Sequence, residues 1–143
     1  MKTIKQLLSE KGANIYSISP DATVYQALQL LAEKDIGALL VIEDESVVGI
    51  ISERDYARKV ILSGKSSKDT YVKDIMTPDV ICINLAQSVE ECMAIMTQKH
   101  IRHLPVLEGS RLMGVISIGD VVKSIITEQG FLIDHLVSYI TGR

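Results

Sequence analysis

Aromatic residues and long apolar runs are scarce in this chain. Its 143 residues include no Trp and a single Phe, and aromatic residues make up 4% although 47% are hydrophobic. Ile, Val and Leu must therefore form the core of what the length predicts to be one compact domain. No run approaches the roughly 18 apolar residues that span a membrane, and the N-terminus has no apolar signal segment. We expect a soluble, cytoplasmic protein with no membrane partner.

Cysteine is scarce as well, and basic residues do not outnumber acidic ones. The two cysteines, Cys82 and Cys92, lie in apolar patterns without CxxC spacing, which indicates buried free thiols in a reducing compartment. The formal net charge is −3, so no basic footprint favours a nucleic-acid partner. His100 and His103 lack a cysteine at the spacing of a metal site, so the sequence predicts no metal.

The common catalytic motifs are also missing. Gly64-Lys65-Ser66 resembles the end of a phosphate-binding P-loop, but Lys59 occupies the place of its first glycine. The segment from Gly114 to Gly119 is one residue too long for the G-x-S-x-G turn that carries a nucleophilic serine. No carboxylate pair can be assigned to acid–base work, and we predict that the protein is not an enzyme.

The sequence does contain a long internal repeat. Residues 15–61 recur as residues 80–126 at a fixed offset of 65, and 12 of the 47 aligned positions are identical. A repeat of this length is one supersecondary unit used twice, which predicts two pseudo-symmetric halves with a cleft between them. The identities concentrate at the end of each unit, in Gly49–Asp55 and Gly114–Asp120.

Each repeat has the hydrophobic pattern of a β-α-β-β-α unit. In the first, Ile15–Ser19 is a short strand and apolar residues follow at helical spacing from Val24. Ala38–Ile42 and Val47–Ile51 flank a polar turn and form a hairpin, after which Ser52 begins another helix. The pattern therefore predicts an α/β fold built from two such units.

Two further helices flank the repeats. Thr3–Lys11 reads as a short helix with Thr3 as N-cap and Gly12 as its stop. After Gly130 comes a helix with an apolar stripe at Leu132, Ile133, Leu136, Val137 and Ile140. Because the second repeat is already complete, something else must cover this stripe. We predict a homodimer held partly by this helix; the alternative is a monomer in which the helix folds back.

The doubled motif Ser52-x-x-Asp55 and Ser117-x-x-Asp120 allows two readings. [ST]-x-x-[DE] before an apolar helix is a capping box, which satisfies the free N–H groups of the first helical turn. The same carboxylate could instead accept the hydroxyls of a ribose, while the helix N-terminus favours a phosphate. The two roles are compatible.

Arg102 and His103 are unusual residues for the start of an apolar strand. The matching positions of the first repeat hold Gly37 and Ala38. Arg102, helped by His103, could contact a phosphate; the alternative is an exposed strand end. Arg54 is a second candidate for a phosphate contact or a solvated helix residue.

Taken together, the tandem units resemble a pair of CBS domains, also called a Bateman module. The resemblance rests on the G-apolar-apolar-[ST]-x-x-D ending of both repeats, on the segments Ser52–Tyr56, Ile101–Val106 and Ser117–Val122, and on Tyr139-Ile140-Thr141-Gly142. It implies two CBS repeats, residues 15–66 and 80–129, joined by a linker of residues 67–79. Residues 1–14 then form an N-terminal helix and residues 130–143 a C-terminal helix.

The resemblance also implies a ligand. CBS pairs of this kind bind adenosine nucleotides, which makes AMP, ADP, ATP and NAD(H) the candidates, with AMP or NAD first, and an unknown effector protein reads the bound state. A site in related modules combines one repeat's Asp with the other's backbone wall, which would pair Asp120 with Ile18, Thr23 and Ala38, and Asp55 with Ile83 and Ser88. The implied nucleotide-binding residues are Ile18, Thr23, Gly37, Ala38, Ser52, Arg54, Asp55, Ile83, Ser88, Arg102, His103, Ser117 and Asp120. The alternative is a ligand-free dimerisation or interaction module in which both motifs act only as caps.

Overall fold

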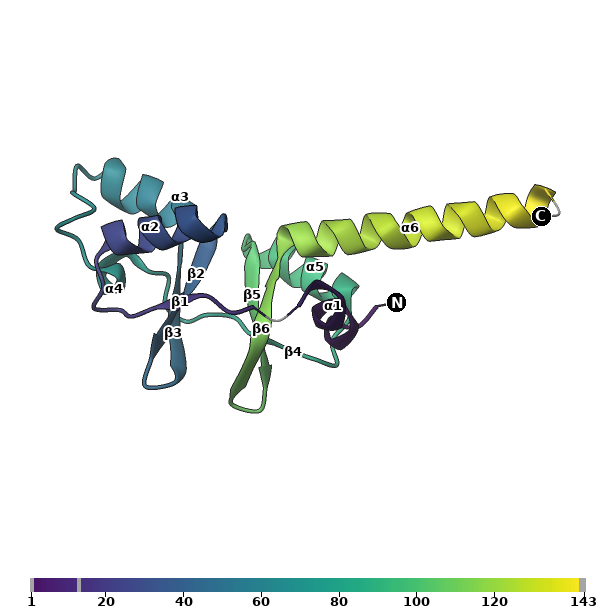
Figure 1. The fold of residues 1–143 in the computed structure, drawn as a ribbon, viewed down its shortest axis with the longest axis horizontal. Helices are drawn as coiled ribbons and strands as arrows, with labels where there is room; N and C mark the ends of the chain where they lie inside the picture. Colours follow the sequence, from purple (N-terminus) through teal and green to yellow (C-terminus); the bar gives the residue numbers. More distant parts are fainter. Residues whose placement is uncertain (1, 13, 142–143) are drawn as a thin grey trace. The chain divides into compact units, whose positions relative to one another are not determined.

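Two three-stranded sheets, one for each repeat, organise the chain (Figure 1). The computed structural model describes residues 2–12 and 14–141. Its elements are α1 (Ile4–Lys11), β1 (Ser17–Ile18), α2 (Val24–Lys34), β2 (Ala38–Glu43), β3 (Ser46–Ser52), α3 (Glu53–Tyr56), η1 (Ala57–Ile61), α4 (Val72–Ile75), β4 (Ile83–Asn84), α5 (Val89–Lys99), β5 (His103–Glu108), β6 (Arg111–Ser117) and α6 (Ile118–Thr141). The predicted α/β fold of two β-α-β-β-α repeats is confirmed.

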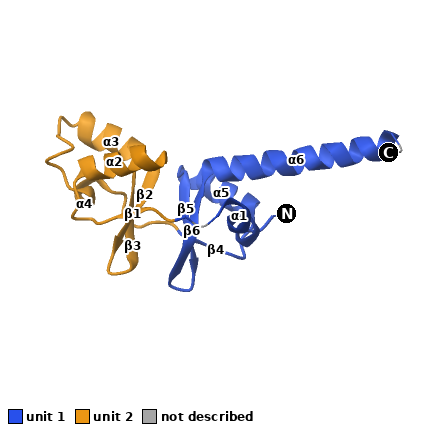
Figure 2. Ribbon diagram, in the orientation of Figure 1, with its two compact units in different colours: residues 1–14, 82–143 blue, residues 15–81 orange. Residues whose placement is uncertain are grey.

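The repeats correspond to two compact units, coloured separately in Figure 2. The first-repeat unit consists of residues 15–81, and the second-repeat unit combines residues 1–14 with residues 82–143. In each sheet the first strand pairs parallel with the second, and the second pairs antiparallel with the third. Ala38 lies opposite Ser52 in one hairpin and His103 lies opposite Ser117 in the other. The strand register therefore brings positions 38 and 103 beside the serine of each S-x-x-D motif.

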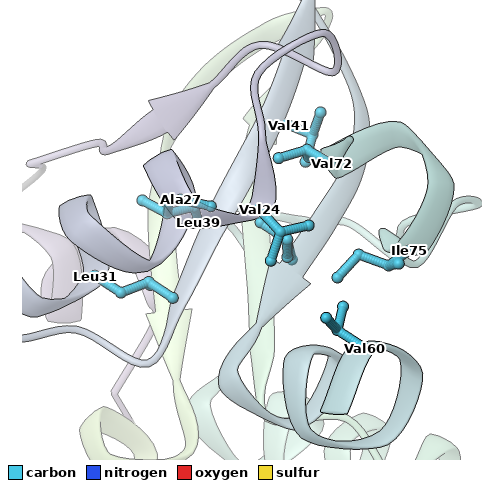
Figure 3. Packing of buried hydrophobic residues seen from close by; sticks show 9 residues of the cluster. Val24, Ala27, Leu31, Leu39, Val41, Val60, Val72 and Ile75 are labelled. Carbon is cyan, nitrogen blue, oxygen red and sulfur yellow. The ribbon is translucent and has the colours of Figure 1, made fainter. Parts of the chain in front are cut away.

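The core of the first-repeat unit is purely aliphatic (Figure 3). It comprises Val24, Ala27, Leu31, Leu39, Val41, Ile51, Val60, Val72 and Ile75. These residues come from one face of α2, from the inner side of the β2–β3 hairpin, from η1 and from α4. Burying each large side chain contributes about 1.5–3 kcal/mol relative to leaving it in water, and the partly buried Tyr16 and Tyr56 pack against the cluster.

Each unit is completed by the segment that precedes the other repeat. The short helix α4 buries Val72 and Ile75 in the first-repeat unit, although the sequence treats residues 67–79 as a linker. Helix α1, which begins at the predicted N-cap Thr3, likewise belongs to the second-repeat unit and buries Ile4 and Leu7. Ala13, within the predicted N-terminal segment, lies outside the described residues.

Matching hydrogen bonds show that α1 and α4 dock in the same way. Val24 donates its N–H to the Thr70 carbonyl at 2.8 Å, and Val89, 65 positions later, donates to the Lys2 carbonyl at 3.0 Å. Both helices pack where a glycine leaves room, because a Cβ on Gly49 would meet Met76 and one on Gly114 would meet Leu8. The docking of α1 fixes the place of Lys11, the last residue of this helix.

The last helix of each repeat differs between the units. In the first, Ser52 caps α3, which passes directly into the π-helix η1. In the second, α6 is one continuous 24-residue helix, whereas the sequence predicts a separate helix after Gly130. A glycine inside a helix costs only about 1 kcal/mol relative to alanine, and the apolar residues on both sides continue at helical spacing.

The second half of α6 is almost entirely solvent-exposed within its own unit, as the yellow part of the helix in Figure 1 shows. Its large apolar residues Leu132, Ile133, Leu136, Val137, Tyr139 and Ile140 are between 51% and 85% exposed. Residues 142 and 143 of the predicted C-terminal helix, including Gly142 of the motif quoted above, lie outside the described residues. Among the helices described, none combines the length and apolar character that crossing a bilayer requires.

Candidate functional site

Both S-x-x-D motifs are capping boxes. Asp55 donates its N–H to Ser52 Oγ at 3.2 Å, and the Ser52 N–H donates back to Asp55 Oδ2 at 3.0 Å. In the second repeat, the Asp120 N–H donates to Ser117 Oγ at 3.2 Å, and the Ser117 N–H donates to Asp120 Oδ2 at 2.8 Å. Reciprocal bonds of this kind satisfy two free N–H groups at the start of each helix. The capping interpretation is confirmed, and it leaves open what else each carboxylate can bind.

The Asp55 carboxylate has a full set of donors. Its Oδ2 accepts from the Ser52 N–H and also from Ser52 Oγ at 3.1 Å. Its Oδ1 accepts from Thr77 Oγ1 at 3.3 Å and lies 3.1 Å from Lys59 Nζ in an ion pair. A carboxylate offers about four acceptor positions, so three hydrogen bonds and the ion pair with Lys59 engage most of this group. The side chain is 12% exposed, and these contacts hold it within the first-repeat unit.

The Asp120 carboxylate is more open. Its Oδ2 accepts from the Ser117 N–H and from Lys11 Nζ at 2.6 Å. Among the described residues, no donor reaches Oδ1 within hydrogen-bonding geometry. The side chain is 23% exposed, about twice the value for Asp55. Asp120 therefore has acceptor capacity facing solvent that Asp55 lacks.

Lys11 is the cation paired with Asp120, and Arg102 and His103 stand at the start of the strand that pairs with β6. Lys11 forms the ion pair and also donates to the Val115 carbonyl at 2.8 Å. Arg102, exposed just before β5, accepts the Ile118 N–H on its carbonyl at 2.8 Å, which ties it to the start of α6. His103, half-buried at the beginning of β5, lies opposite Ser117.

These charges act on the pKa values of the site. Burial lowers the pKa of His103; Asp120 opposes this shift, while Lys11 and Arg102 add to it. Burial alone would raise the pKa of Asp120, but the hydrogen bond from Lys11, the bonds from Ser117 and the Lys11 charge together lower it. The site therefore holds an ionised carboxylate beside a neutral imidazole at neutral pH.

The remaining predicted site residues lie in their own units. Ile83 is buried, and Ile18 packs against the first-repeat core. Thr23 and Ser88 are N-caps of α2 and α5, so each hydroxyl already accepts a backbone N–H. Gly37 accepts the Glu53 N–H on its carbonyl at 3.2 Å, Ala38 pairs with Ser52, and Arg54 is exposed. The pairing of Asp120 with Ile18, Thr23 and Ala38, like that of Asp55 with Ile83 and Ser88, joins residues of different units and stays a prediction.

Sequence reasoning missed the partners of the two carboxylates. Lys59 follows Asp55 by four residues, a helical spacing that would have indicated an ion pair. Thr77 and Lys11 carry no such signal, because Lys11 is 109 residues away from Asp120. Among residues 2–12 and 14–141, no three His, Cys, Asp or Glu side chains lie close enough to hold a metal ion.

The fold and the doubled capping motif together define a tandem-repeat module of the CBS type. The family model described as "CBS domain" matches residues 4–61 and 72–127. The chain belongs to the CBS-domain family, which confirms the resemblance predicted from its sequence.

Known proteins resemble most of the chain. A mitochondrial CBS domain-containing protein of Arabidopsis thaliana, CBSX3, is 38% identical over 98% of this chain and 72% of its own length. The structure of a putative signal-transduction protein with CBS domains from Burkholderia ambifaria is 50% identical, with a TM-score of 0.86 over 90% of this chain and 96% of that one. The structure of CBSX2 in complex with AMP is 25% identical, with a TM-score of 0.73 over 90% and 99% of the two chains.

Proposed function

We propose that this protein is a regulatory module that binds an adenosine nucleotide at Asp120. The observation that carries the proposal is the Asp120 carboxylate, whose Oδ1 is open while its Oδ2 is held by Ser117 and Lys11. A positioned, ionised carboxylate with spare acceptor capacity suits the vicinal hydroxyls of a ribose. The role that we propose for this site is binding.

The groups around Asp120 suit the phosphate of such a ligand. Arg102 is exposed and permanently charged, and its backbone is fixed at the start of α6. Neutral His103 can donate one ring N–H to a phosphate oxygen. The N-terminus of the 24-residue helix α6 adds the favourable end of its dipole for a negative charge. Ribose and phosphate would thus be held by neighbouring groups of the second-repeat unit.

Among the candidate ligands AMP and NAD come first, with ADP, ATP and NADH as alternatives. The presence of AMP in the related CBSX2 structure supports a nucleoside phosphate. Ile18, Thr23 and Ala38 are the residues that we propose to contact the adenosine from the first repeat. Ligand binding would shift the population of two conformations, and an effector protein would read the difference. A cytoplasmic location stays a prediction.

Ligand-induced stabilisation tests this function. A nucleotide that binds only the folded chain stabilises it by about 2.7 kcal/mol when present at 100 times its Kd. Thermal unfolding should therefore shift upward with AMP or NAD and not with equal concentrations of a pyrimidine nucleotide. If no adenine nucleotide raises the midpoint, even at millimolar concentration, the proposed function is wrong.

We further propose that the chain is a homodimer through α6. The exposed apolar residues of this helix gather on one broad face, which a single helix in water would leave uncovered. A second copy offers the same face and an isologous contact. This observation also favours the alternative function, an interaction module without ligand, and the absence of any nucleotide-induced shift would support that alternative.

A further inference from the structure

The two units neutralise their motif carboxylates with lysines from different places. In the first, Lys59 lies on η1, four residues after Asp55, and also donates to the Ile75 carbonyl at 3.0 Å. The matching position of the second repeat is Ser124, whose buried Oγ has no hydrogen-bond partner among the described residues. Lys11, brought from α1, supplies the missing charge there. The second-repeat unit thus has no lysine at the local position and pairs its carboxylate with one from a distant segment.

The position of Lys11 leaves it able to bind a ligand. An ammonium group has three N–H donors, and Lys11 uses two, on Asp120 Oδ2 and on the Val115 carbonyl. Its side chain is 33% exposed, so the third donor can face a solvent-borne partner. Gly12 ends α1 immediately after Lys11, which fixes where the lysine stem starts.

The charge around Asp120 also differs from that around Asp55. Asp120 pairs with Lys11, and the exposed Arg102 stands just before β5, whereas Gly37 stands at the Arg102 position of the first repeat. Asp55 pairs with Lys59 and also accepts from Thr77. A partly exposed cation paired with an open carboxylate suits a ligand that carries both hydroxyls and an anionic group.

We propose that Lys11 is a specificity-determining residue of the Asp120 site, donating its free N–H to the phosphate of a bound nucleotide. The inference rests on the proposed function and adds a residue to it. Lys11 and Ser117 both hold Asp120 Oδ2, so the carboxylate keeps the Ser117 bond for its orientation, while the remaining donor of Lys11 is available to a phosphate. The site then selects nucleoside phosphates over free nucleosides.

Titration calorimetry with AMP and with adenosine tests this role in the full chain. Lys11→Met should weaken AMP binding about tenfold or more, the scale of one lost charge-assisted hydrogen bond. It should change adenosine binding by less than about threefold, a change below one such bond. Lys11→Arg should restore most of the preference for AMP, because it keeps the charge and the donors. Lys59→Met is the matched control, which should leave the ratio of AMP to adenosine affinity unchanged.

The outcomes separate the two proposals. If the wild type binds neither AMP nor adenosine, the proposed function fails and the role of Lys11 falls with it. If the wild type binds AMP but Lys11→Met weakens AMP and adenosine equally, Lys11 only supports the fold of the site. An increase in both affinities would show that Lys11 blocks Asp120 instead of binding the ligand. Thermal unfolding of each variant confirms that losses of affinity do not come from unfolded protein.

Discussion

At the scale of residues, identical motifs acquire different roles from their surroundings. Asp55 and Asp120 occupy matching positions and cap matching helices, yet three hydrogen bonds and an ion pair engage the first carboxylate while the second keeps Oδ1 open. The differences include Thr77, which donates to Asp55, and the lysine of each ion pair, which is Lys59 on η1 for Asp55 and Lys11 on α1 for Asp120. A sequence motif can therefore be structural in one repeat and available for binding in the other.

The half-buried imidazole of His103 should make stability depend on pH. Its folded pKa is lowered, chiefly by burial, so the unfolded chain binds more protons just below 6.5, the ordinary value. The free energy of unfolding should therefore fall as the pH drops below 6.5 and stay level above it. Asp120, whose folded pKa is also lowered, loses its contribution only below its ordinary value of 3.8.

Urea unfolding of the wild type and of His103→Gln across this pH range measures the effect. The free energy of unfolding of His103→Gln should no longer change around pH 6.5, and it should still fall at lower pH. His100→Asn serves as control, because His100 is exposed at the end of α5 and has a left-handed backbone that Asn tolerates. If the free energy of unfolding changed equally with pH around 6.5 in the wild type and in His103→Gln, the role given to His103 would be wrong.

Sequence alone locates the motif carboxylates but not their partners. The repeat and the S-x-x-D spacing are local patterns, so Ser52, Asp55, Ser117 and Asp120 are predictable as caps. The bond from Lys11 to Asp120 spans 109 residues and depends on how α1 docks, and nothing in the sequence singles out this lysine among 15 Lys and Arg.

At the scale of elements, the tendency of a glycine to end a helix is overruled where apolar residues continue at helical spacing on both sides. Gly130 suggests a helix end, yet α6 continues through it, since the apolar face recurs on both sides. The strands and the helices with clear hydrophobic spacing are predictable, because their patterns are local. The docking of α1 in the second-repeat unit and of α4 in the first-repeat unit is not predictable, since it depends on tertiary packing.

Gly130→Ala should stabilise α6 within the folded chain. The position is open, with no atom within 4 Å of an added Cβ, so only the backbone entropy of glycine is removed. We expect the free energy of unfolding to rise by about 0.5–1 kcal/mol. Chemical denaturation measures it, and a decrease would mean that α6 breaks at Gly130 as the sequence suggests.

Gly49→Ala should act in the opposite direction. Its Cβ would lie 2.5 Å from Met76 Sδ and 3.1 Å from the Thr77 carbonyl oxygen, so the Met76 side chain must move and the backbone after α4 must give way. Overpacking of this kind costs about 1–3 kcal/mol. A neutral effect in the same denaturation experiment would show that α4 does not pack on β3 as described.

At the scale of the whole molecule, the exposed face of α6 should set the oligomeric state. Light scattering at micromolar concentration should give about twice the 15.7 kDa of one chain. Leu136→Glu should favour the monomer, because it places a charge in the apolar face, while Ser138→Glu on the opposite face should not. A monomeric wild type would contradict the proposal, and a dimer that survives truncation after Gly130 would remove α6 from the interface.

The most direct test of the nucleotide site is calorimetric titration of AMP into three proteins. The wild type should show saturable binding, Asp120→Asn should bind at least about tenfold more weakly through loss of the ribose bonds, and Asp55→Asn should stay within about threefold of the wild type. Retained affinity in Asp120→Asn, or no saturable binding to the folded wild type, would contradict the account.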